Sequence, residues 1–285
     1  MLTLLLVFAA GQPAAGSHDE QNPLYRSLLT SGLLVGPDRR AKFPAPTLPD
    51  GLDAAAQKAA LTTLLGPDYS LAEFTRKSVV APHLLKLRDV TPSDPQAPAR
   101  GVDVWFVVHG EMGRLEDEKF LERIAGHGRD GGKVAALTTD DLARRKIPAP
   151  GKQEGYGVVE FDFLDKVRVR ATGRAVWSRT AESVVVAAEI DPRFAADAEF
   201  PNQWQPLSKE GGVVKAGPPQ PWGGAALYLK ITRLAEPQGA LFCEQHVIFT
   251  EPTGWFDGAN LLRSKLPPVV QNNVRSVRKE WLKGN

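Results

Sequence analysis

Residues 249–281 read FTEPTGWFDGANLLRSKLPPVVQNNVRSVRKEW, and the second half of this stretch decides the fold that we predict. Its apolar residues recur at spacings of three and four, at Leu266, Val270, Val274, Val277 and Trp281. This period predicts a long helix with one apolar stripe, which must be buried against another element. We expect Asp257 to cap the helix, and Pro267-Pro268 either to kink it or to start a second helix.

Strand-like segments precede this helix. β-Branched and aromatic residues are concentrated in residues 102–108, 158–164, 167–180, 183–191, 225–234 and 240–250. The last two segments should pair as a hairpin around Glu236-Pro237-Gln238-Gly239, a sequence that favours a turn. Residues 194–221 lack this pattern, and we expect them to be irregular. Successive strands followed by one amphipathic helix predict an α+β fold, in which an antiparallel sheet wraps around the C-terminal helix.

The C-terminal segment also carries a family resemblance. From Phe249-Thr250-Glu251-Pro252 through Gly254-Trp255-Phe256 and into Lys265-Leu266-Pro267-Pro268, the chain resembles the START-like, helix-grip superfamily. The resemblance covers residues 70–285 and rests on the order of the elements. It implies a cavity closed by the terminal helix. Lipid carriers, hormone receptors and some enzymes share this shape, so the resemblance implies no particular ligand.

The N-terminal region differs in composition from the rest. The apolar run Leu2–Ala10 and the small residues that follow it are typical of a secretory signal peptide over residues 1–16. No Lys or Arg precedes Arg26, so a misassigned start codon or an N-terminal helix is the alternative. We expect an exported protein, periplasmic or extracellular. Residues 17–69 should form a helical and Pro-rich arm, and residues 70–285 the α+β domain.

Composition excludes several function classes. The chain has 285 residues and a net charge of +2, which is too balanced to favour a nucleic-acid partner. Cys243 is the single cysteine, so an intrachain disulfide and a cysteine-based metal site are excluded. No apolar run approaches the ~18 residues of a transmembrane helix.

One predicted strand has two contrasting faces. Its basic face holds Lys166, Arg168, Arg170 and Arg174. Its other face holds Val167, Val169, Ala171, Gly173, Ala175 and Trp177, and is small in the middle. The small residues either let the helix pack closely or leave a cavity. The basic face is either solvated or binds an acidic partner such as an anionic lipid surface.

Few residues offer catalytic chemistry. We find no Gly-x-Ser-x-Gly motif, and the Gly-rich residues 126–132 lack the Lys-Ser/Thr ending of a phosphate loop. His109 and Glu111 share a strand face, but two ligands do not define a metal site. Glu244 and His246 also share a face and could do acid–base work or bind a ligand head group. We therefore assign no catalytic residue, metal or cofactor.

These observations leave three hypotheses. The first is a non-enzymatic exported protein that holds a small apolar ligand or lipid beneath the C-terminal helix. Its candidate ligand-binding residues are Ala171, Gly173, Ala175, Trp177, Glu244, His246, Val270 and Val274. The second is an envelope interaction protein with a filled core, whose protein partner is unknown. The third is a hydrolase built around Glu244 and His246.

Overall fold

The computed structural model describes residues 16–283, apart from residues 37, 91–97, 127–131 and 257–260. The predicted signal peptide, except for Gly16, and the predicted cap Asp257 therefore lie outside the described residues.

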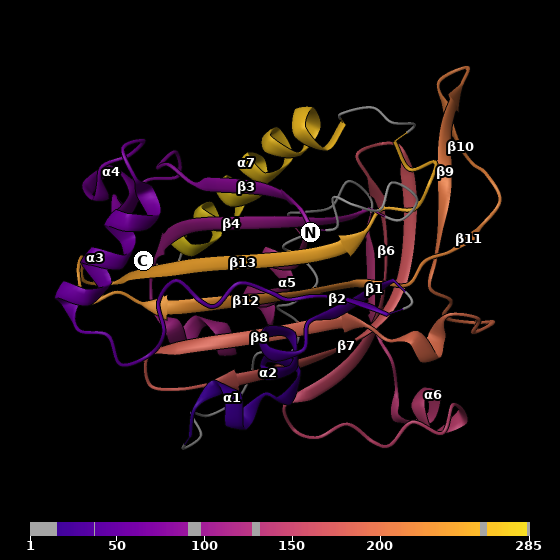
Figure 1. The fold of residues 1–285 in the computed structure, drawn as a ribbon, viewed down its shortest axis with the longest axis horizontal. Helices are drawn as coiled ribbons and strands as arrows, with labels where there is room; N and C mark the ends of the chain where they lie inside the picture. Colours follow the sequence, from indigo (N-terminus) through magenta and orange to yellow (C-terminus); the bar gives the residue numbers. More distant parts are fainter. Residues whose placement is uncertain (1–15, 37, 91–97, 127–131, 257–260, 284–285) are drawn as a thin grey trace.

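One large antiparallel sheet dominates the described part of the chain (Figure 1). Its main path has the order β10-β9-β7-β8-β12-β13-β4-β3, while β11 pairs with β9, and β6 pairs with both β5 and β7. The strands are β3 (Leu84–Asp89), β4 (Ala99–His109), β5 (Lys133–Ala136), β6 (Glu154–Phe163), β7 (Val167–Arg179), β8 (Ser183–Ile190), β9 (Gln203–Glu210), β10 (Val213–Ala216), β11 (Gln220–Pro221), β12 (Ala225–Arg233) and β13 (Ala240–Thr250). A small separate sheet joins β1 (Leu33–Gly36) to β2 (Arg39–Ala41).

Helices lie on both faces and at one end of this sheet. They are α1 (His18–Gln21), α2 (Pro23–Thr30), α3 (Ala54–Leu65), α4 (Leu71–Thr75), α5 (Glu118–Gly126), α6 (Thr139–Arg144) and α7 (Leu261–Leu282). The predicted fold class is confirmed, because a large antiparallel sheet packs against the long C-terminal helix α7. The sheet is not closed into a barrel.

The predicted hairpin is confirmed and forms the centre of the sheet. β12 pairs with β13 from Ala225 opposite Phe249 to Arg233 opposite Leu241. On its other side β13 pairs with β4 along its whole length. Ten consecutive residues of β13, from Ala240 to Phe249, are buried, so both faces of this strand are covered.

The prediction that residues 194–221 are irregular is wrong. Part of this segment forms β9 and β10, which pair with each other, and β11, which pairs with β9. β9 is mostly polar and half-buried or exposed, and β10 is exposed at every position although it contains Val213 and Val214. Because no apolar face is buried along most of their length, they lack the alternating pattern by which a strand is recognised in a sequence. Trp204 of β9 is buried and anchors the segment in the core.

Helix α7 is continuous over 22 residues and contains both Pro267 and Pro268. The prolines therefore do not start a second helix. The predicted apolar stripe is buried against the sheet, with Val274 at 0% and Trp281 at 1% exposure. Trp281 packs edge-to-face on Phe120 of α5 at a centroid distance of 4.9 Å. We call the face of the sheet beneath α7 the inner face.

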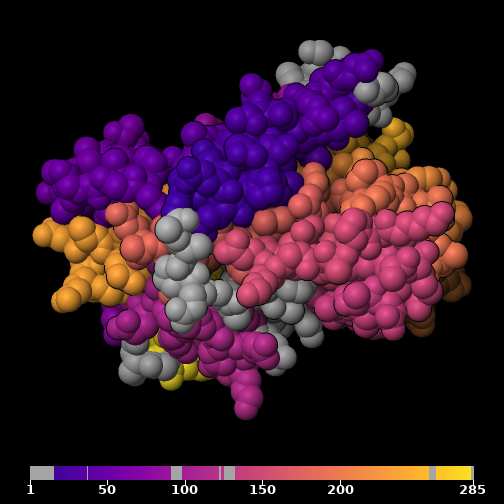
Figure 2. Space-filling view, turned by 90° about the horizontal axis from the view of Figure 1, so that it is seen from below, coloured from indigo at the N-terminus to yellow at the C-terminus, as the bar shows by residue number. Residues whose placement is uncertain are grey.

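The N-terminal arm covers the opposite face, which we call the outer face (Figure 1). Leu24, Tyr25 and Leu28 of α2 pack on Val185 and Ala187 of β8 in one apolar cluster. Figure 2 shows the N-terminal residues, in indigo, as a layer along one side of the molecule. The sheet is thus sandwiched between the two ends of the described chain.

Helix α7 should be indispensable to the core. Val274→Asp would bury an unpaired carboxylate, and we expect the free energy of unfolding to fall by at least ~3 kcal/mol. The matched change Val269→Asp, at a position that is 41% exposed on the same helix, should cost less than about 1 kcal/mol. Urea denaturation of the two variants provides the measurement. Equal stability of both variants, or cooperative melting of a fragment that ends at residue 256, would contradict this role.

Candidate ligand-binding cavity

A cavity of about 400 Å³ lies between the inner face of the sheet and the N-terminal half of α7. Its lining is mostly apolar. The sheet contributes side chains such as Val104, Val159, Val169, Leu227 and Val247, and α7 contributes Leu266 and Val270. Ligand-binding pockets of proteins commonly measure about 300–1,000 Å³ and have this apolar character.

Three alanines on the sheet leave space for the cavity because their side chains are small. Ala171 and Ala175 of β7 and Ala188 of β8 line it and are each 5–6% exposed. Ala175 lies directly opposite Ala188 in the paired strands, so two small side chains are adjacent. Larger residues at these positions would fill the space beneath α7.

Gly173 also lines the cavity, but for a different physical reason. A Cβ atom at this position would lie 2.6 Å from the backbone oxygen of Glu189. Gly173 is the point where β7 leaves β8, since β8 pairs with residues 173–179 and β9 with residues 167–170. The glycine therefore permits a close approach of two backbones. A leucine here would be destabilising whether or not the cavity is hollow.

The small strand face of β7 lies along the cavity, whereas the close packing of α7 occurs in its C-terminal half, on β4. Leu266 and Val270, in the N-terminal half, line the cavity. Val274 is fully buried and is not among the lining residues. The buried Arg278 fixes the C-terminal half, because its guanidinium donates to the backbone oxygens of Val107 at 2.9 Å and Pro82 at 2.8 Å.

The eight predicted site residues are not all brought together. Ala171, Gly173, Ala175 and Val270 line the cavity. Trp177 and Val274 belong to the same apolar core but do not line it. Glu244 and His246 point to the outer face, because alternate residues of a strand face opposite sides and Gln245 and Val247 line the cavity.

Sequence reasoning missed two polar residues of the cavity, Gln245 and Trp255. Gln245 stands between Glu244 and His246, and the apolar residues Cys243 and Val247 share its face. That alternation was the available signal, because a face of apolar residues predicts burial. Trp255 belongs to an aromatic cluster with Phe163, Trp222 and Phe249, at centroid distances of 5.3–6.1 Å.

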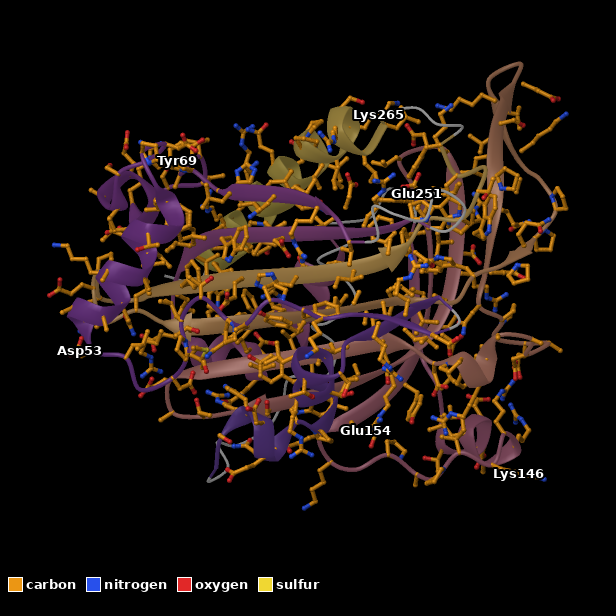
Figure 3. The ribbon with its side chains drawn as sticks, viewed as in Figure 1. Asp53, Tyr69, Lys146, Glu154, Glu251 and Lys265 are labelled. Atoms are coloured by element: carbon orange, nitrogen blue, oxygen red, sulfur yellow. The ribbon has the colours of Figure 1, made fainter. Side chains whose placement is uncertain are left out.

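Charged side chains border the cavity where it meets solvent. Lys133, Asp165 and Lys265 line it and are exposed. Figure 3 shows Lys265 in the first turns of α7. Two residues of the basic strand face are paired with carboxylates, since Arg168 bonds Asp162 at 2.7 Å and Arg174 bonds Glu154 at 2.5 Å. Arg170 donates to the backbone oxygen of Glu199 at 2.7 Å.

On the outer face, His246 joins a buried cluster of charged groups. Its Nδ1 lies 2.9 Å from Asp103 Oδ1, and Arg88 pairs with the same carboxylate at 2.5 Å. His246 Nε2 lies 3.5 Å from Glu244 Oε2. Burial lowers the pKa of His246, but the bonds to Asp103 and Glu244 outweigh it and hold that pKa above its ordinary value of 6.5. Burial likewise raises the pKa of Asp103, and the bonds from His246 and Arg88 reverse the shift and lower it.

This cluster and its neighbours fasten the Pro-rich part of the arm. Glu244 Oε2 accepts a hydrogen bond from the backbone of Thr47 at 2.8 Å. On β12, Tyr228 donates to the Pro44 oxygen at 2.9 Å, and the buried Lys230 donates to the Leu48 oxygen at 2.8 Å. Polar side chains of the two central strands thus pair with backbone groups that a Pro-rich segment cannot pair within itself.

Glu244 and His246 are covered by the arm in this structure. Their side chains are 0% and 1% exposed. No group of three His, Cys, Asp or Glu side chains among the described residues is arranged to hold a metal ion. No described helix is long and apolar enough to cross a bilayer.

His18 secures the start of the arm. Its Nδ1 and Nε2 lie 2.7 Å from the hydroxyls of Ser178 and Ser183, and Ser183 also donates to Asp50 at 2.6 Å. Burial lowers the pKa of His18 from 6.5 to about 4, opposed in part by the Asp50 carboxylate. The folded protein therefore holds this imidazole neutral.

Comparison with known proteins gives distant matches among solved structures. A scan against models of known protein families finds none, and no curated protein matches the sequence. Several solved structures match the fold, and three of them are described below. The lipid transfer and protein localization domain of human StarD13 is 8% identical, with a TM-score of 0.42 over 72% of this chain and 86% of that chain. A protein from Rhizobium leguminosarum is 10% identical, with a TM-score of 0.34 over 66% of this chain and 98% of that chain. The Mll3558 protein from Rhizobium loti is 12% identical, with a TM-score of 0.32 over 65% of this chain and 98% of that chain.

The predicted START-like, helix-grip resemblance is confirmed in the arrangement of the sheet and α7.

The neutral His18 predicts a pH dependence. Between pH 6.5 and 4 the unfolded chain binds more protons at this residue, so folding stability should fall as the pH falls through this range. From pH 7 to 4.5 the contribution is on the order of 2–3 kcal/mol. His18→Gln retains hydrogen bonding without titrating, so urea denaturation should show a shallower loss of stability in this variant. His246 and the carboxylates titrate in both proteins and cancel in the comparison. Equal pH slopes would show that His18 does not control the loss.

Proposed function

We propose that this protein binds a small apolar molecule, such as a lipid chain, in the cavity beneath α7. The observation that carries the proposal is the apolar space of about 400 Å³ between a sheet with small floor residues and a helix held at its far end. Arg278 and Trp281 hold the C-terminal half of α7, while its N-terminal half stands over the cavity. Apolar space of this kind favours an apolar occupant, because filling it recovers dispersion contacts and removes apolar surface from water.

Two alternative functions are less well supported. The first alternative is a partner-binding protein with a filled core. It gives no role to the cavity beneath α7. A hydrolase that uses Glu244 and His246 would need access to both side chains, and both are buried under the arm. Their contacts to Thr47 and Asp103 give them a structural role instead.

We also propose that the protein is exported and that residues 1–16 are removed. Ser17 caps α1 in a capping box with Glu20, and His18 bonds two buried serines. Cleavage just before Ser17 would leave this capping box and the contacts of His18 intact.

Filling the cavity should separate ligand binding from stability. The probe is pyrene, an uncharged fluorescent hydrocarbon, and we expect the parent protein to bind it. Ala188→Leu places three more carbon atoms in the cavity, so we expect pyrene affinity to fall about tenfold or more, a loss of at least ~1.4 kcal/mol in binding free energy. Stability should change by less than about 1 kcal/mol, because the added group enters empty space. Fluorescence titration and urea denaturation measure the two quantities.

Ala187→Leu is the matched control, since Ala187 is the preceding residue, is 0% exposed and packs beneath the arm. It should overpack the outer face at a cost of about 1–3 kcal/mol and leave pyrene affinity unchanged in the folded fraction. A parent protein that binds no pyrene, together with equal destabilisation by both leucines, would contradict a hollow inner face.

Export has its own test. The N-terminal sequence of the protein recovered from the producing cell should begin at Gly16, Ser17 or His18. Recovery from the cytosol of a chain that retains Met1 would contradict the proposal.

A further inference from the structure

Gln245 is a polar side chain in the apolar floor of the cavity. It is 2% exposed, and its Nε2 has no hydrogen-bond partner among the described residues. Its cross-strand neighbours are Val104 of β4 and Leu229 of β12, and Cys243 and Val247 lie on either side of it on the same face. None of these four side chains is an effective acceptor for a hydrogen bond from the Gln245 amide. A buried amide without a hydrogen-bond partner lowers the free energy of unfolding. The presence of Gln245 at this site therefore needs an explanation.

A second lining residue has the same property. Trp255 is 3% exposed, and its indole Nε1 has no hydrogen-bond partner among the described residues. Aromatic rings surround it, including Trp222 and Phe249. The cavity wall thus has two buried N–H donors, Gln245 Nε2 and Trp255 Nε1, for which the described residues supply no acceptor.

The charge distribution restricts the nature of that acceptor. The charged side chains that line the cavity are Lys133, Glu160, Asp162, Asp165, Arg174, Glu189 and Lys265, and all of them are exposed or half-buried. Arg174 is already paired with Glu154. Gln245 has no charged cross-strand neighbour on β4 or β12. A charged head group beside Gln245 would therefore be buried without a counter-charge, which is strongly unfavourable.

We propose that the cavity binds an uncharged amphipathic molecule whose hydroxyl or carbonyl oxygen accepts a hydrogen bond from Gln245. The apolar part of the ligand then lies along Val247 and the alanine floor, beneath Val270 of α7. The carboxamide of Gln245 can also accept a hydrogen bond, so a long-chain alcohol can use both of its functions. This inference rests on the proposed function and specifies the chemical class of its ligand.

The test compares ligands that share one chain but differ in their head groups. In competition with pyrene, the parent protein should bind 1-decanol at least tenfold more tightly than decanoate at pH 8, where the carboxylate is ionised. Gln245→Leu removes the amide and retains an apolar side chain of similar size. In this variant 1-decanol affinity should fall about tenfold, which corresponds to the loss of one buried hydrogen bond, while pyrene affinity stays equal or rises.

Thr232→Val is the matched control. Thr232 is 1% exposed, its hydroxyl has no partner among the described residues, and it follows Ile231 on β12, so it faces the outer side of the sheet. Removing this buried polar atom should leave both ligand affinities unchanged. Thermal melting of each variant establishes that it is folded before affinity is measured.

The outcomes separate this inference from the proposed function. If Gln245→Leu binds 1-decanol as tightly as the parent, or if decanoate binds the parent as well as 1-decanol does, the head-group assignment is wrong while apolar binding stands. If the parent binds neither pyrene nor 1-decanol, the proposed function fails and this inference fails with it. A loss of 1-decanol binding confined to Gln245→Leu supports both.

Discussion

The structure depends on one constraint, which is that the central strands of the sheet are buried on both faces. All residues of β13 from Ala240 to Phe249 are buried, so each face needs a separate cover. Helix α7 covers the inner face, and the N-terminal arm covers the outer face. Because successive side chains of a strand point in opposite directions, Glu244, Gln245 and His246 serve different faces although they are adjacent in sequence.

Both covers pack on the sheet through apolar side chains, but their polar contacts differ. The Pro-rich part of the arm is also held by buried polar contacts, in which Tyr228, Lys230 and Glu244 pair with backbone groups of residues 44–48. Such contacts are directional, and an unpaired member would be costly in a dry interface. Helix α7 is held mainly by its apolar stripe and by Arg278 near its C-terminal end. Attachment at that end allows its N-terminal half to stand over a cavity without loss of the fold.

The distribution of polar atoms on the inner face points to function. Apolar side chains and three alanines make a space that a hydrocarbon would fill, while Gln245 and Trp255 contribute N–H groups without partners among the described residues. A fully apolar lining would be the more stable choice for an empty or filled core, because buried polar groups need partners. The ligand that we propose would account for both the space and the unpaired donors.

The sequence by itself determined the strands 102–108, 167–180 and 240–250, the hairpin turn at residues 236–239 and the apolar stripe of the C-terminal helix. These features follow from local periodicity and turn chemistry, which act over a few residues. Tertiary structure decided the rest, because contacts such as Tyr228 to Pro44 join residues 184 positions apart. It placed Glu244 and His246 beneath the arm and Gln245 in the cavity. Tertiary structure also brings the backbone of Glu189 close to Gly173, where a side chain would not fit. The residues adjacent to Gly173 in the sequence do not specify this neighbour.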